Sequence, residues 1–200
     1  LQLVPKMLRM LRPDLTIGIL TGSGGTFCAG MDLKGFARGE RPSLPGRGFA
    51  GLTEAPPSKP LIAAVEGWAL AGGCELALAA DLIVASTDAK FGLPEVKLGI
   101  IPGWGGSVRL PALIGAPAAM DLMLTGRTVS ASAAKAMGLV DHVAEPDRLI
   151  DAAAAMALRE QQRPLKQSLL ARITNLKPVR AALAPTLARQ VARKARKAHY

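Results

Sequence analysis

Residues 61–85 read LIAAVEGWALAGGCELALAADLIVA, and this stretch decides the fold class. It begins with a short, branched apolar run at 61–65 and ends with another at 82–85, which is typical of buried strands in a parallel sheet. The segment 72–80 between them starts with two glycines and reads as a short, nearly all-apolar helix. The order strand, helix, strand predicts parallel pairing through a right-handed crossover.

Upstream of this unit the pattern continues with a third apolar run. Residues 15–20 (LTIGIL) predict another buried strand, which the glycine-rich segment 21–25 ends. Residues 1–11 have apolar side chains at helical spacing. Residues 35–60 contain five prolines and five glycines without a clear period, so we predict a surface loop long enough to be a lid, with one helical turn near 34–37.

Downstream the sequence predicts mainly helices. Proline and glycine positions indicate helices over 103–113, 117–124 and 130–138, followed by a last strand at 139–143 and a helical region from 147 onward.

The positive charge is concentrated in the last quarter of the chain. The 200 residues carry 25 Lys and Arg against 15 Asp and Glu, but residues 1–150 hold 14 against 13 and residues 151–200 hold 11 against 2. A nucleic-acid-binding role of this basic end is one interpretation. Against it, residues 158–199 contain no Phe, Tyr or Trp for base stacking and no known nucleic-acid motif.

Hydropathy and cysteine usage restrict the class of protein further. The most apolar segment, 67–86, is interrupted by Glu75 and Asp81, which excludes a transmembrane helix there. Cys28 and Cys74 lack metal-ligand spacing and favour a reducing compartment, although one bridge between them stays open. Since no signal-peptide pattern is present either, we expect a cytoplasmic protein with no metal site.

Two glycine-rich segments can present main-chain N–H groups to a ligand. The first, FCAGMDL at 27–33, follows a strand and a glycine turn, and the second, AGGCE at 71–75, opens a helix. Donors from both could hold a developing oxyanion. An ordinary turn and an ordinary helix cap are the alternative interpretations.

Two glutamates lie in apolar surroundings. Glu75 follows the second glycine segment, and Glu95 lies in FGLPE at 91–95, ahead of GIIPGWGG at 99–106. Burial raises the pKa of a carboxyl group toward the range that is useful for proton transfer near neutral pH. A first-turn position for Glu75 and a solvent-facing position for Glu95 are the alternatives, but together the four features describe one acid/base site with an oxyanion hole.

These motifs carry a resemblance. FCAGMDL, AGGCELALAADLIVA and FGLPEVKLGIIPGWGGSVRL occur in the order found in the crotonase (enoyl-CoA hydratase/isomerase) superfamily, and the match runs over about residues 15–143. The resemblance implies an α/β fold, the ClpP/crotonase spiral of ββα units with C-terminal helices. It divides the chain into a hydratase core at 1–146, with further strands expected before it, and a basic helical region at 147–200.

A narrower resemblance is to the N-terminal hydratase domain of the multifunctional fatty-acid oxidation complex alpha subunit. It rests on GLPEVKLGIIPGWGGSVRLPALIGA and on the closing RKARKAHY. It implies a 3-hydroxyacyl-CoA dehydrogenase domain after this chain.

The resemblance also assigns roles to residues. It implies that the amides of Met31 and Gly72 form the oxyanion hole, that Glu75 and Glu95 are the catalytic base and acid, and that Gly103 helps to place the attacking water.

The remaining implications concern substrate and partners. Asp32, Leu33 and Lys34 would contribute to CoA binding, although a solvated lysine is the alternative for Lys34. The implied activity is hydration of 2-trans-enoyl-CoA to 3-hydroxyacyl-CoA in fatty acid β-oxidation, with isomerisation, thioester hydrolysis or decarboxylation as alternatives. No separate cofactor is expected, because the CoA thioester is the substrate. Expected protein partners are copies of the chain or other β-oxidation enzymes.

Overall fold

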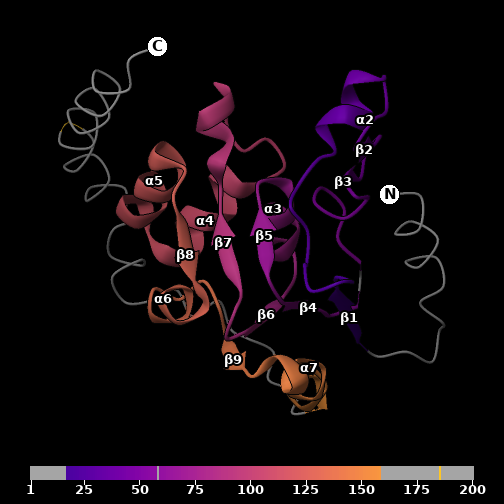
Figure 1. The fold of residues 1–200 in the computed structure, drawn as a ribbon, viewed down its shortest axis with the longest axis vertical. Helices are drawn as coiled ribbons and strands as arrows, with labels where there is room; N and C mark the ends of the chain where they lie inside the picture. The colour runs from indigo at the N-terminus through magenta and orange to yellow at the C-terminus, as the bar shows by residue number, and fades with distance from the viewer. Residues whose placement is uncertain (1–16, 58, 159–184, 186–200) are drawn as a thin grey trace.

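Four parallel strands form the main sheet of the molecule (Figure 1). The computed structural model describes residues 17–57, 59–158 and 185. The strands lie in the order β1, β4, β6 and β9, with bounds Gly18–Thr21, Leu61–Val65, Leu82–Ser86 and His142–Ala144. The strands predicted at 61–65 and 82–85 are confirmed, and the run predicted at 15–20 forms a strand from residue 18.

A second sheet of three strands was not predicted from the sequence. It contains β5 (Trp68–Leu70), β7 (Lys90–Gly92) and β8 (Thr128–Ser130), with β5 and β7 parallel and β7 and β8 antiparallel. Each strand has three residues, so none is long enough to show a period of two in the sequence.

The chain alternates between the two sheets before it enters each helical segment. β4 is followed by β5 and α3 (Gly72–Leu78), and β6 is followed by β7 and the 3₁₀ helix η1 (Pro94–Leu98). This confirms the spiral of ββα units.

Helices α4 (Gly106–Ile114), α5 (Ala116–Thr125) and α6 (Ala131–Ala136) confirm the predicted helical segments, with shifted ends. α4 starts at 106 and not at 103, because 103–105 form a turn in which Gly105 has φ +104°. The last strand starts at His142 and not at 139, because Leu139 and Val140 are buried in the core at the end of α6.

The prediction of a surface loop over 35–60 is wrong for its middle part. Residues 33–37 form the short helix α2 (Leu33–Ala37), and β2 (Ser43–Leu44) and β3 (Gly48–Phe49) form a small antiparallel pair. Phe49, Leu52 and Thr53 are each only 1% exposed. The segment therefore belongs to the core, where the Phe49 ring offsets the cost of ordering a chain rich in glycine and proline.

The main sheet is buried on both faces. Ile62, Ala64, Leu82 and Val84 pack with Leu149 and Ala153 of α7 (Leu149–Leu158), which follows the 3₁₀ turn η2 (Pro146–Arg148). The alternate residues of the same strands face the larger core. Double-sided burial explains why these strands read as continuous apolar runs.

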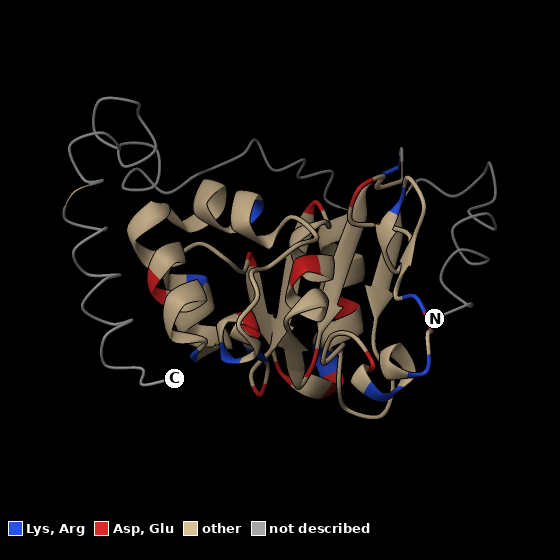
Figure 2. Cartoon of the chain, turned by 90° about the horizontal axis from the view of Figure 1, so that it is seen from above, with Lys and Arg blue, Asp and Glu red and all other residues tan. Residues whose placement is uncertain are grey.

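Charged residues of the described chain are dispersed over many elements (Figure 2). Among the described helices, none has the length and apolar character needed to cross a membrane. Most of the basic region at 147–200 lies outside the described residues, so its predicted roles stay predictions.

We expect Ile62→Ala to lower the free energy of unfolding by about 2–5 kcal/mol, the range for truncating a large buried aliphatic side chain. Ile62 is 0% exposed between β4 and α7. Ile150→Ala is the matched control, because Ile150 lies on α7 with 48% exposure and should change stability by less than about 1 kcal/mol. Urea denaturation of both variants measures the difference, and equal effects would contradict the packing described for α7.

Candidate active site

Glu75 occupies the first turn of α3 and is fully buried. The helix begins directly after Ala71, a non-glycine residue with φ +50° and ψ −126°, which offers no side-chain cap. This uncommon conformation is held by two hydrogen bonds, since the Ala71 N–H donates to the Gly92 carbonyl and the Ala71 carbonyl accepts from the Glu75 N–H. The sharp turn places Glu75 inside the protein while its helix is still starting.

The Glu75 carboxylate is held by main-chain amides from a distant segment. Its Oε1 accepts hydrogen bonds from the N–H groups of Trp104 at 2.7 Å and Gly106 at 2.8 Å. Gly105 between them has the left-handed conformation that lets neighbouring amides converge on one anion. At Gly106 a Cβ atom would lie 3.1 Å from the same Oε1 and 3.0 Å from Glu75 Cγ, so glycine permits the close approach.

Glu95 lies in the first turn of η1 and is 6% exposed. Burial, together with the nearby charge of Glu75, raises its pKa to about 7 against the lowering effect of its own backbone N–H. Burial raises the pKa of Glu75 too, while the Gly106 and Trp104 amides and the Arg109 charge oppose the rise. The structure thus brings the two predicted glutamates within electrostatic reach and gives them different surroundings.

Each glutamate keeps one free carboxyl oxygen. Within the described part of the chain, Glu75 Oε2 and Glu95 Oε2 are the buried side-chain oxygens that have no hydrogen-bond partner. A buried polar atom without a partner is costly, so such atoms often mark a place that a ligand completes. The arrangement can therefore exchange protons with a small polar group bound beside both carboxyls.

The first glycine-rich segment packs against the start of α3. The Cys28 N–H donates to the Trp68 carbonyl, and the Cys28 carbonyl accepts from the Leu70 N–H. A Cβ on Gly30 would lie 3.5 Å from the Gly72 nitrogen. The segments that carry Met31 and Gly72 are therefore adjacent, as their predicted joint role requires, although the role itself stays a prediction.

An aromatic pair covers the beginning of α3. The rings of Phe49 and Trp104 stack with centroids 4.6 Å apart, and a Cβ on Gly72 would lie 3.0 Å from the Trp104 ring and 3.2 Å from the Phe49 ring. The predicted oxyanion donor thus lies under an apolar wall that lowers the local dielectric constant.

The other predicted residues lie at the rim. Asp32 is the N-cap of α2, and its Oδ1 accepts from the amides of Lys34 and Gly35. Leu33 and Lys34 are exposed, and Gly103 lies in the exposed turn before α4. Their predicted CoA-binding and water-positioning roles are untested. Among the described residues, no group of three His, Cys, Asp or Glu side chains is arranged to hold a metal ion.

Sequence reasoning missed Trp104, Gly106, Phe49, Thr53 and Arg109. Only the Gly105–Gly106 pair carried a recognisable signal, a positive-φ turn ahead of a helix. The others contribute main-chain atoms or ring packing across long sequence separations, which no local pattern reports.

Comparison with known proteins agrees with this geometry. The family model described as enoyl-CoA hydratase/isomerase matches residues 5–199. The chain belongs to the enoyl-CoA hydratase/isomerase family. It is therefore a member of the crotonase superfamily, as the motifs indicated.

Several relatives of this crotonase-family chain show the same relationship. It is 46% identical over 168 residues to a carnitinyl-CoA dehydratase of Salmonella arizonae, covering 81% of this chain and 64% of the relative. A crystal structure of an enoyl-CoA hydratase from Mycobacterium marinum aligns with TM-score 0.75 and 57% identity over 78% of this chain and 63% of that one. A carnitinyl-CoA dehydratase from Mycobacterium avium aligns with TM-score 0.72 and 40% identity, covering 96% of this chain and 77% of that structure. The chain spans 57–64% of the length of curated carnitinyl-CoA dehydratases that it matches.

We expect Gly73→Ala to destabilise the crotonase-family chain strongly. A Cβ at this position would lie 1.9 Å from the Cys28 carbonyl oxygen, so the 27–31 segment would have to move away from α3. Gly103→Ala is the matched control, because its Cβ would meet only the Ile101 carbonyl at 4.0 Å. Thermal unfolding of the two variants checks this, and equal melting temperatures would contradict the described contact.

Glu95→Gln is expected to raise the free energy of unfolding at pH 8 more than at pH 5. The pKa of Glu95 rises from 4.5 to about 7 on folding, so the stability that its proton provides is complete below the unfolded value and is lost as pH rises through the folded value. Glutamine keeps the neutral form at all pH values. Denaturant titrations at both pH values test this, with the exposed Glu145→Gln as control; a gain of equal size at both pH values would refute it.

Proposed function

We propose that the chain hydrates 2-trans-enoyl-CoA thioesters to 3-hydroxyacyl-CoA thioesters. The observation that carries this proposal is the pair of buried glutamates, each with one free oxygen and each in a different electrostatic environment. Two titratable groups whose surroundings separate their pKa values are suited to act as an acid and a base at one pH.

In the proposed reaction Glu75 is the base. Its Oε1 is fixed by two amides, which favours the ionised form, and its free Oε2 takes a proton from a bound water. The water oxygen then bonds to the β-carbon. Glu95 is the acid, because its pKa of about 7 leaves it protonated in a large fraction of molecules at neutral pH, and its proton goes to the α-carbon.

The negative charge that develops on the thioester oxygen needs donors of its own. We assign the amides of Met31 and Gly72 to this role, with Gly103 assisting the water, on the family resemblance and on the adjacency of the two segments. One such donor is worth about 3–4 kcal/mol of transition-state stabilisation. The CoA moiety would then extend over Asp32, Leu33 and Lys34 at the exposed rim.

A second candidate is dehydration of a carnitinyl-CoA-type substrate, which the 46–49% identity to carnitinyl-CoA dehydratases favours. Elimination of water from a 3-hydroxyacyl thioester is the reverse of hydration, so the same two glutamates would serve. Comparing kcat/KM for crotonyl-CoA hydration and carnitinyl-CoA dehydration distinguishes the two candidates. Isomerisation, the remaining alternative, requires only one of the carboxyls.

We expect Glu75→Gln and Glu95→Gln each to lower the rate of crotonyl-CoA hydration by about 10²–10⁴-fold, the range for loss of a positioned acid or base. Loss of the conjugated thioester absorbance measures the rate. Glu145→Gln, on the exposed surface, is the control for a lost carboxylate. If one glutamine variant retained full hydration, the two-glutamate mechanism would be wrong; retained double-bond migration in that variant would instead support an isomerase.

A further inference from the structure

Arg109 links two segments behind the candidate site. It lies on α4 and is half-buried, with Nη1 donating to the Trp104 carbonyl at 3.1 Å and Nη2 donating to the Thr53 carbonyl at 2.5 Å. A Cβ on Gly105 would lie 1.9 Å from Nη1, so the absence of a side chain at 105 lets the guanidinium reach the turn.

The turn that Arg109 contacts is the turn that holds Glu75. Trp104 binds the glutamate through its N–H and the arginine through its carbonyl, while Gly106 supplies the second amide. The guanidinium fork is planar and rigid, so bridging two carbonyls fixes the turn more firmly than one flexible contact would.

We propose that Arg109 is a positioning residue for Glu75: it fixes the 104–106 turn through the Trp104 carbonyl and supplies the positive charge that favours the ionised carboxylate. This inference rests on the proposed role of Glu75 as base. The arginine touches neither glutamate through a hydrogen bond in the described structure, so it acts through the turn and through its field.

The charge balance around Glu75 supports this role. Arg109 on α4 lowers the pKa of Glu75, whereas Glu95 on η1 and Cys74 on α3 are the other titratable groups coupled to it, and β5 contributes only Trp68, Ala69 and Leu70. Among these groups Arg109 is the one that carries positive charge. Its loss should therefore leave a carboxyl that holds its proton to higher pH.

The contact with Thr53 offers a competing explanation, which the test has to separate. Thr53 Oγ1 accepts from the Phe49 N–H at 2.8 Å, so Arg109 also anchors the segment that carries the Phe49 ring. Arg47 anchors the same segment from its other side, through the carbonyls of Gly51 and Ala55. Arg47→Gln thus loosens the segment without removing the charge near Glu75.

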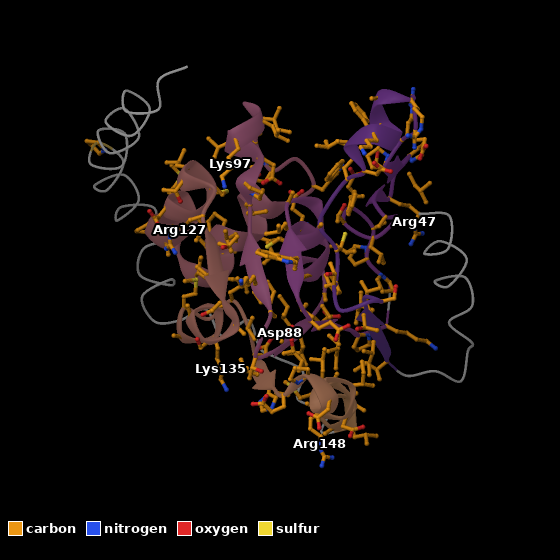
Figure 3. The ribbon with its side chains drawn as sticks, in the orientation of Figure 1. Arg47, Asp88, Lys97, Arg127, Lys135 and Arg148 are labelled. Carbon is orange, nitrogen blue, oxygen red and sulfur yellow. The ribbon has the colours of Figure 1, made fainter. Side chains whose placement is uncertain are left out.

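The experiment titrates Glu75 directly in substrate-free protein, by NMR of side-chain carboxyls labelled with ¹³C, with Glu75→Gln to assign the signal. Arg109→Gln is expected to raise the pKa of Glu75 by about one unit, the lower end of the effect of one nearby opposite charge. Arg47→Gln and Arg127→Gln should leave it unchanged. Figure 3 shows Arg47 and Arg127 on opposite sides of the molecule, and Arg127 pairs with Asp121 at 2.7 Å on the exposed surface.

Two outcomes would overturn the proposal: an unchanged Glu75 titration in Arg109→Gln, or an equal shift in Arg47→Gln. Should Arg109→Gln fail to fold, Arg109→Lys tests the positioning alone. Because an ammonium cannot bridge both carbonyls, hydrogen exchange at the Trp104 and Gly106 amides should accelerate about tenfold, the equivalent of one hydrogen bond. Unchanged exchange would overturn the proposal.

Activity gives a separate readout. In Arg109→Gln the acidic limb of the kcat/KM profile for crotonyl-CoA should move to higher pH by the same amount as the titration, while the losses at pH 8 stay smaller than those at pH 6. A wild-type chain without turnover would reject the proposed function, yet the titration would still decide whether Arg109 acts on Glu75.

Discussion

The candidate site depends on one interaction, the grip of two main-chain amides on a single oxygen of Glu75. A buried carboxylate is costly unless donors replace the water it has lost, and here the donors come from a turn 29 and 31 residues further along the chain. That turn can reach Glu75 only because Gly105 and Gly106 lack side chains. The first turn of α3, the start of α4 and the aromatic pair above them are arranged around this contact.

The two glutamates show how one fold gives like residues different tasks. Both carboxyls are buried, but only Glu75 receives amide donors from other segments and a neighbouring guanidinium. Glu95 has its own backbone N–H and faces the charge of Glu75, so its neutral form is favoured. Keeping a carboxyl in such surroundings lowers stability at high pH, which is the type of local cost that functional sites commonly carry.

Much of the main sheet and the pair of glutamates could be predicted from the sequence. The runs at 61–65 and 82–85 are apolar on both faces, and Ser130 and Gly138 mark the ends of α6, because these signals are local. The three-residue strands β5, β7 and β8 are too short to show a pattern. Phe49 and Thr53 lie in a stretch rich in glycine and proline, and their burial depends on contacts with Trp104 and Arg109 that are more than 50 residues away. Long-range contacts of this kind leave no periodic trace.

Trp104 meets the two charged groups through its backbone and the beginning of α3 through its ring. The N–H and carbonyl belong to every amino acid except proline at the nitrogen, so they stay in place when the side chain is replaced. The indole, in contrast, is a removable panel that shapes the space above Gly72. Position 104 therefore offers a route by which the scaffold can diversify the acyl groups it admits while the proton-handling pair keeps its support.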